Sequence, residues 1–110
     1  NGLKLLEGFS KEKPWHLVVN FTGPHDPMDV TAAMHRSWQG VEFPGPHANS
    51  TDTEFNHQAI RQNYAAMIEN IDGHIANYLK LLETRGEFEN TVVIYSSDHG
   101  EMLGDHWSLG

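Results

Sequence analysis

The sequence predicts an α/β fold built on a βαβ unit, in which a long helix connects two parallel strands. Two short runs rich in β-branched and aromatic residues, at about 15–21 and about 91–97, are typical of buried strands. Between them, apolar residues repeat with the period of an α-helix over about 57–85. A strand, a helix and a second strand in this order form a right-handed crossover, which makes the two strands parallel.

A short amphipathic helix comes first in the chain. Residues 2–10 place Leu3, Leu6 and Phe9 at helical spacing, which predicts one apolar face. The first strand follows this helix. Glycine and proline at 22–27 end that strand, because proline removes a donor from a strand ladder and glycine permits a sharp turn.

The long segment 28–56 has the composition of a loop. Glycines and prolines interrupt it, and a polar cluster at 49–52 indicates a turn. Residues 30–38 are compatible with one or two helical turns. A loop of this length is uncommon inside a compact domain unless it serves a function.

The segment 57–85 is the clearest element of the sequence. Gly86 is suited to the position after a helix end, and Arg85 lies favourably near the negative end of the helix dipole. The second strand then ends in a polar turn that begins at Asp98. The apolar face of the predicted helix consists of Ile60, Tyr64, Met67, Ile68, Ile71, Ile75, Leu79 and Leu82.

The composition is that of a soluble globular domain, or of part of a larger one. The 110 residues carry a net charge of −8, and the seven basic residues are scattered, which argues against a nucleic-acid surface. No apolar run reaches the roughly 20 residues that span a bilayer, and no signal-peptide pattern is visible. Without cysteine, the chain has no disulfide, thiolate metal site or cysteine nucleophile. Compartment and oligomeric state are not predicted.

Polar residues follow both predicted strands. His25 lies after the first strand, and Asp98 and His99 follow the second. Because ligands bind beyond the carboxyl ends of parallel strands, we expect these three residues to converge. A carboxylate and an imidazole suit Zn²⁺ or Mn²⁺, whereas an aspartate-rich site suits Ca²⁺ or Mg²⁺. Two ligands are too few for a complete site, and a simple turn at Asp98 to Gly100 is the alternative.

Prolines on both sides of His25 predict a stiff loop around its imidazole. His25 could therefore act as a general acid or donate a hydrogen bond to an anionic oxygen, and a turn histidine is the alternative. Asp26 either orients His25 or caps a turn, and the structural role is the expected one. His106, in a second polar turn, is a further candidate for the same pocket.

Four stretches of the chain resemble the sulfatase family of the alkaline-phosphatase-like superfamily. Each stretch is weak alone, but together, in the family's order, they cover nearly the whole chain. They are VVNFTGPHDP at 18–27, YAAMIENID at 64–72, NTVVIYSSDHGE at 90–101 and LGDH at 103–106.

The resemblance implies an alkaline-phosphatase-like α/β sandwich and a role for each matching residue. Asp98 and His99 match two ligands of a divalent metal, for which the family favours Ca²⁺ and the imidazole leaves Mn²⁺ or Zn²⁺ open. His25 matches a histidine that contacts the sulfate ester and helps to protonate the leaving group or to stabilise the oxyanion. His106 is a second candidate for substrate binding.

The chain departs from the family pattern at the nucleophile. The family uses a formylglycine, made from Cys or Ser in a Cys/Ser-x-Pro-x-Arg stretch, and no such stretch occurs here. The pair of aspartates that completes the metal site is also missing. We therefore expect residues 1–110 to be a central segment of a sulfatase catalytic domain, incomplete at both ends and inactive by itself.

The expected function is hydrolysis of a small-molecule sulfate ester by the intact parent protein. His99 stands where many sulfatases have asparagine, so a phosphonate monoester or phosphodiester hydrolase of the same superfamily is the alternative. A non-catalytic binding module that keeps the fold is the third possibility. The formylglycine is expected in the parent, outside this chain.

Overall fold

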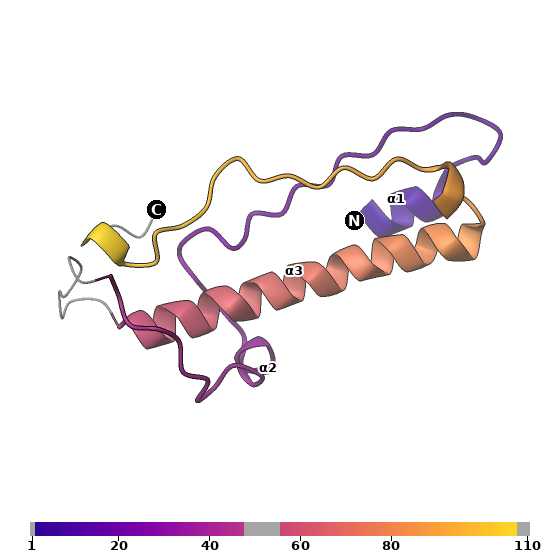
Figure 1. Ribbon diagram of the computed structural model, residues 1–110. Helices are drawn as coiled ribbons and strands as arrows, with labels where there is room; N and C mark the ends of the chain where they lie inside the picture. The colour runs from indigo at the N-terminus through magenta and orange to yellow at the C-terminus, as the bar shows by residue number, and fades with distance from the viewer. Residues whose placement is uncertain (1, 48–55, 108–110) are drawn as a thin grey trace.

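The computed structural model describes residues 2–47 and 56–107, and one long helix is the spine of the molecule (Figure 1). The molecule is elongated, with extents of 57 × 27 × 21 Å. The elements, in chain order, are α1 (Gly2–Gly8), α2 (Ala32–His35), α3 (His57–Arg85), and the 3₁₀ turns η1 (Phe88–Asn90) and η2 (Asp105–Trp107).

Helix α3 confirms the prediction over 57–85 at both ends. At its start, the side chain of Asn56 accepts a hydrogen bond from the N–H of Ala59, at 3.1 Å, and so satisfies one of the free donors of the first turn. At its end, Gly86 adopts a left-handed φ of 70°, and its N–H donates to the carbonyl of Glu83 at 2.9 Å. Glycine adopts this conformation without a steric penalty, so the helix stops here.

Helix α1 confirms the predicted N-terminal helix, although it ends at Gly8. It packs near the C-terminal end of α3, where Leu6 and Leu82 are 2% and 4% exposed. The Arg85 guanidinium donates to the carbonyls of Glu7 and Phe9 at 2.8 and 2.9 Å. The apolar contact and these charged hydrogen bonds hold the two helix ends together.

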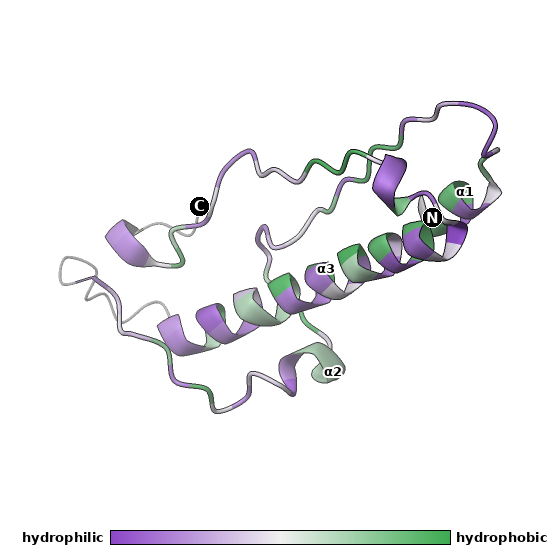
Figure 2. Ribbon diagram, turned by 45° about the vertical axis from the view of Figure 1, so that its right-hand side comes forward, coloured by the Kyte–Doolittle hydropathy of each residue, from purple (hydrophilic) through white to green (hydrophobic). Residues whose placement is uncertain are grey.

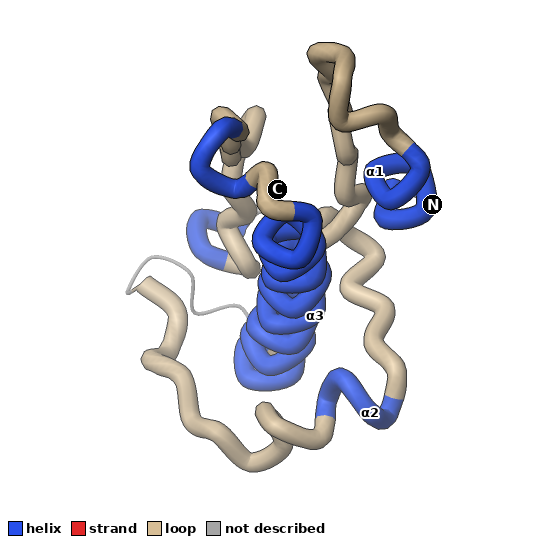
Figure 3. Tube along the Cα trace, turned by 90° about the vertical axis from the view of Figure 1, so that its right-hand side faces the viewer, coloured by secondary structure: helices blue, strands red, loops and turns tan. Residues whose placement is uncertain are grey.

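The expected strands at 15–21 and 91–97 are not present in the parts of the chain that the structure describes. Both segments are irregular and extended, and they run in the same direction along one side of α3 (Figures 1 and 3). A strand needs a hydrogen-bonded neighbour about 4.8 Å away, and within the described ranges neither segment has one. The βαβ unit is therefore not confirmed, although its order and direction are those expected.

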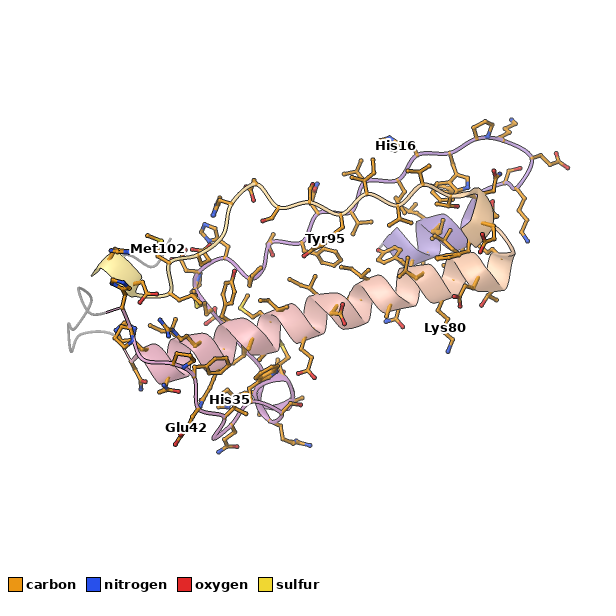
Figure 4. All side chains as sticks on the ribbon, in the orientation of Figure 1. His16, His35, Glu42, Lys80, Tyr95 and Met102 are labelled. Atoms are coloured by element: carbon orange, nitrogen blue, oxygen red, sulfur yellow. The ribbon has the colours of Figure 1, made fainter. Side chains whose placement is uncertain are left out.

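The second extended segment leaves apolar side chains in solvent. Val92 and Ile94 are 87% and 85% exposed, and Figure 2 shows this stretch as one of the most hydrophobic of the trace. Tyr95 lies between the segment and α3 (Figure 4). The composition of this run is that of a strand buried on both faces, as the sequence predicted. Its side chains, however, are exposed rather than buried.

The segment after the first extended run contains one helical turn, α2, as the sequence allowed. The Thr31 hydroxyl accepts from the N–H of Met34 and caps this turn. The Trp38 indole N–H donates to Glu69 on α3 at 2.8 Å, which fixes the loop against the helix. The polar cluster predicted at 49–52 lies outside the described residues. None of the helices in the described ranges has the length and hydropathy of a membrane span.

Candidate metal and active site

The ends of the two extended segments bring His25 and His99 together. Their ring centroids lie 6.1 Å apart, with one ring edge towards the other. The two residues are 74 positions apart in the sequence, and each follows the apolar run that was expected to lead to the site. The approach of these two histidines therefore agrees with the expected convergence.

Asp26 holds the imidazole of His25 from the next position in the chain. Nδ1 of His25 lies 2.7 Å from the Asp26 carbonyl and 2.9 Å from an Asp26 carboxylate oxygen. With Nδ1–H as the donor to the carbonyl, Nε2 keeps its lone pair. The hydrogen bond to this carbonyl, followed by the Asp26 charge, raises the pKa of His25 above its usual value. Of the two roles considered for Asp26, this geometry favours orienting the imidazole.

Asp98 and His99 form a polar turn after the second segment. A carboxylate oxygen of Asp98 accepts the N–H of His99 at 3.1 Å, and Nδ1 of His99 donates to the Gly100 carbonyl at 2.9 Å. Nε2 of His99 is thereby left as the basic nitrogen, as in many histidines that bind metals. The bond to Gly100 and then the Asp98 charge raise the pKa of His99.

Glu101 is a further acidic residue at this place. Its side chain is only 4% exposed, and Oε1 lies 4.0 Å from Nδ1 of His99. Its other oxygen, Oε2, is buried and has no hydrogen-bond partner among the described residues. One ligand atom each from His25, His99 and Glu101 lie within 4.8 Å of one another, so the site has two imidazoles and one carboxylate.

Glu101 was not predicted as a site residue. The predicted turn covers Asp98 to Gly100, although Glu101 belongs to the stretch at 90–101 that resembles the family. The available signal was its spacing, because residues two positions apart on an extended chain point to the same side. Asp98, which was expected as a ligand, is not in this three-residue cluster and instead bonds the main chain of His99.

Helix α3 contributes Tyr64 to the surroundings of the site. Burial raises the pKa of the Tyr64 hydroxyl, and the negative charge of Glu101 raises it further. Tyr64 therefore stays protonated, and its hydroxyl remains a hydrogen-bond donor at neutral pH.

The structure places His106 in a second cluster near the start of α3. The rings of His106 and His47 stack with centroids 5.5 Å apart. The neighbouring Asp105 carboxylate accepts from the His47 N–H at 2.9 Å and from Arg61 at 3.2 Å. His106 does not belong to the cluster of His25, His99 and Glu101, whose ligand atoms lie close together.

The chemistry available to this site follows from its donors. Two imidazoles and a carboxylate are suitable ligands for a divalent cation such as Zn²⁺ or Mn²⁺, which the imidazole of His99 had left open beside Ca²⁺. An imidazole with one nitrogen fixed as a donor can also accept or deliver a proton at the other nitrogen. Metal binding and proton transfer near an anion are therefore both within reach of these residues.

Comparison with known proteins finds one family. The sequence profile of the Sulfatase family matches residues 2–110. An arylsulfatase of Clostridium perfringens is 31% identical over 86% of this chain and 24% of its own length, and a choline-sulfatase of Rhizobium meliloti is 27% identical over 84% and 22%. The multifunctional alkaline phosphatase superfamily protein PehA of Trinickia caryophylli is 39% identical over 46% of this chain and 10% of its own length.

No solved structure gives a significant match. The chain spans about a quarter of the length of the sulfatases that it matches along most of its own length. The family implies an alkaline-phosphatase-like α/β fold for the whole domain. A family match over residues 2–110 is decisive, and the chain belongs to the sulfatase family.

Proposed function

We propose that this chain supplies part of the active site of a metal-dependent hydrolase of small-molecule sulfate esters. The observation that supports the proposal best is the meeting of His25 and His99, whose rings lie 6.1 Å apart at the ends of two parallel segments. The arylsulfatase and choline-sulfatase relatives are named for this class of reaction.

In this proposal, Asp98 and His99 bind the metal and His25 contacts the ester. Nε2 of His99 is the nitrogen free for a cation, because Nδ1 donates to the Gly100 carbonyl. Ca²⁺ is the proposed ion, with Mn²⁺ or Zn²⁺ as alternatives. A bound divalent cation would stabilise negative charge on the sulfate oxygens.

His25 would work through the nitrogen that Asp26 leaves free. Its Nδ1–H is held by the Asp26 carbonyl at 2.7 Å, so a protonated Nε2 can point at the leaving oxygen. The raised pKa of His25 increases the share of imidazolium near neutral pH, which suits delivery of a proton to a leaving alkoxide or phenoxide. His106 is proposed as a further substrate contact, which it would make from its place beside His47.

The rest of the active site would come from the parent protein. The nucleophile is proposed to be a formylglycine outside this chain, and a further pair of aspartates would complete the metal site. The extended segments 15–21 and 91–97 are proposed to join a parallel sheet there, which would bury the exposed Val92 and Ile94. The chain alone would then lack sulfatase activity.

A phosphonate monoester or phosphodiester hydrolase is the second candidate. Two observations favour keeping it: the imidazole at His99, and the match to a relative whose name describes a multifunctional alkaline phosphatase superfamily protein. Both reactions expel an oxygen leaving group from a tetrahedral anion. His25 and His99 would therefore serve either substrate.

The test is hydrolysis of an aryl sulfate and an aryl phosphonate monoester by the full-length parent, with Asp98→Ala and His25→Ala. His16→Ala is the matched control, because His16 lies on the outer side of the first segment (Figure 4). Faster sulfate turnover, lost in both site variants and kept in the control, is the expected result. Faster phosphonate turnover would favour the second candidate, and no turnover of either ester would leave a binding module.

The metal is tested in the same assay. Chelation should abolish turnover, and Ca²⁺, Mn²⁺ and Zn²⁺ are then added back one at a time. Recovery with Ca²⁺ is expected, and full activity in the presence of the chelator would rule out a metal-dependent mechanism.

A further inference from the structure

The first two turns of α3 hold the irregular segment 41–45 through its main chain. The Gln58 side-chain amide accepts from the N–H of Phe43 at 2.9 Å and donates to the Phe43 carbonyl at 2.7 Å. The Gln62 amide donates to the carbonyl of Val41 at 2.9 Å. Because these bonds satisfy main-chain groups that lack a partner in regular secondary structure, they fix the path of the segment along α3.

Arg61 joins this segment to a second loop, 102–106, at the start of α3 (Figure 1). Its guanidinium donates to the carbonyls of Pro44 and Gly45, at 3.2 Å for Gly45, and to the Asp105 carboxylate at 3.2 Å. The side chain is only 11% exposed. Arginine presents its donors in a rigid planar fork, so a single residue can bind two carbonyls and a carboxylate at once. Arg61 is thus a contact that both loops share.

Asp105 extends this contact to two histidines. The carboxylate oxygen that accepts from Arg61 also accepts from the main-chain N–H of His47 at 2.9 Å, and the His47 ring stacks on that of His106. His106 has a left-handed φ of 51°, a conformation that a residue with a β-carbon keeps only where its surroundings impose it. Residues held in this way are concentrated at functional sites.

The stacked histidines lie beside the candidate active site. Arg61 and Tyr64 are three residues apart on one face of α3, which separates them by about 4.5 Å along the helix axis. Tyr64 belongs to the surroundings of the site, where burial and then the charge of Glu101 raise its pKa. Asp105 follows Glu101 by four residues in the chain. The contacts of Arg61 are therefore about one helical turn away from the site.

We propose that Arg61 is a positioning residue of the substrate site, which acts through Asp105 to fix His47 against His106. The two stacked imidazoles form a wall on which the organic part of the ester lies while its sulfate faces His25. Flat imidazole faces suit an aromatic or other cyclic group. The inference rests on the proposed hydrolysis, because it assigns this wall to the same substrate. Arg61 itself places the imidazoles and does not touch the ester.

The experiment measures kcat and KM for an aryl sulfate with the full-length parent. Arg61→Met removes the charge and the donors but keeps an unbranched side chain, and Arg36→Met is the control at an exposed arginine just after α2. KM should rise about 10-fold in Arg61→Met, since losing one well-placed contact has roughly this effect. The value of kcat should change little, because His25 is left in place. The control should match the wild type.

Two further variants show whether Arg61 acts through Asp105. Arg61→Lys keeps the ion pair but not the planar fork, so it should restore part of the lost affinity. Asp105→Asn should raise KM as Arg61→Met does. The double variant should raise KM no further than Arg61→Met alone, because the two changes interrupt the same contact. Additive effects would show that the two residues act separately.

Imidazole resonances of the same proteins need no turnover. Stacked rings shift the C–H resonances of each other, so those of His47 and His106 should move in Arg61→Met and stay in place in Arg36→Met. The resonances of His25 should stay in place in both variants, which also shows that the protein has folded. Arg61→Lys provides the same measurement if Arg61→Met does not fold.

The proposal is overturned if the His47 and His106 resonances stay in place in the Arg61 variants, or if kcat falls while KM does not change. A parent that binds the aryl sulfate without hydrolysing it would contradict the proposed function alone. The dissociation constant, read from the same resonances, then takes the place of KM and tests Arg61 by itself. A parent that does not bind the ester would contradict both proposals.

Discussion

Replacing Leu6 by alanine should destabilise the protein far more than the same change at Leu5. The two leucines are neighbours in α1, so the change in helix propensity is the same at both. Their environments differ: Leu6 is 2% exposed where α1 meets α3, and Leu5 is 56% exposed. The pair therefore isolates the contribution of the contact between the two helices.

The size of the difference follows from burial. Fully burying a leucine side chain stabilises a protein by about 1.5–3 kcal/mol, and Leu5 obtains less than half of its possible burial. Leu6→Ala also leaves a cavity, and buried leucine-to-alanine changes cost about 2–5 kcal/mol in total. We expect a loss of about 3 kcal/mol at Leu6 and of at most about 1 kcal/mol at Leu5.

Urea unfolding followed by far-ultraviolet circular dichroism measures both values. For a slope of about 1–3 kcal/mol per molar urea, the midpoint of Leu6→Ala should lie at least about 1 M below that of the wild type. The slope itself should not change. Equal midpoints for the two variants would show that α1 does not pack against α3 in solution.

Three further predictions concern glycines and one carboxylate. Gly73→Ala should stabilise α3 by about 1 kcal/mol and raise Tm by several degrees in a thermal scan, because a Cβ at this position meets nothing within 4 Å. Gly2→Ala should lower Tm in the same scan, since its Cβ would collide with the Tyr78 hydroxyl group, which would have to move; a rise would contradict the close approach. The hydrogen bond from the main-chain N–H of His47 lowers the pKa of Asp105. The ionised Asp105 carboxylate therefore stabilises the fold above about pH 4, and this contribution disappears as the pH falls through the folded-state pKa. Asp105→Asn should therefore be less stable than the wild type at pH 7, and the gap in urea midpoint should close towards pH 3.

Local signals in the sequence predicted the helices well. The boundaries of α3 follow from the repeat of apolar residues and from Gly86, whose left-handed φ of 70° is a property of that single position. A helix satisfies its hydrogen bonds within itself, so such signals suffice. Strand pairing depends on a neighbour elsewhere in the chain. The apolar runs at 15–21 and 91–97 therefore predicted the direction of two extended segments, but they did not predict which strands would pair with them.

Part of the candidate site was predictable from the order of the elements along the chain. His25 and His99 follow two apolar runs that a single long helix connects, and the topology predicted that they would meet. Glu101 was missed because its importance lies in burial, with 4% of its side chain exposed, and burial after a turn has no periodic pattern. His106 was grouped with His25 by its neighbouring motif, whereas its stacking partner is His47.

The approach of His25 and His99 depends on a contact at the opposite end of the molecule. There, the Trp15 indole N–H donates to the Glu87 carboxylate at 3.3 Å, so both extended segments start from one anchor. His25 lies ten residues beyond Trp15, and His99 lies twelve residues beyond Glu87. The 3₁₀ turn η1 takes up the first residues after Glu87, and the extended residues beyond it run beside the first segment in the same direction, so the two segments end near each other. The anchor and the segment lengths thus position the two imidazoles even where no strand ladder connects the segments.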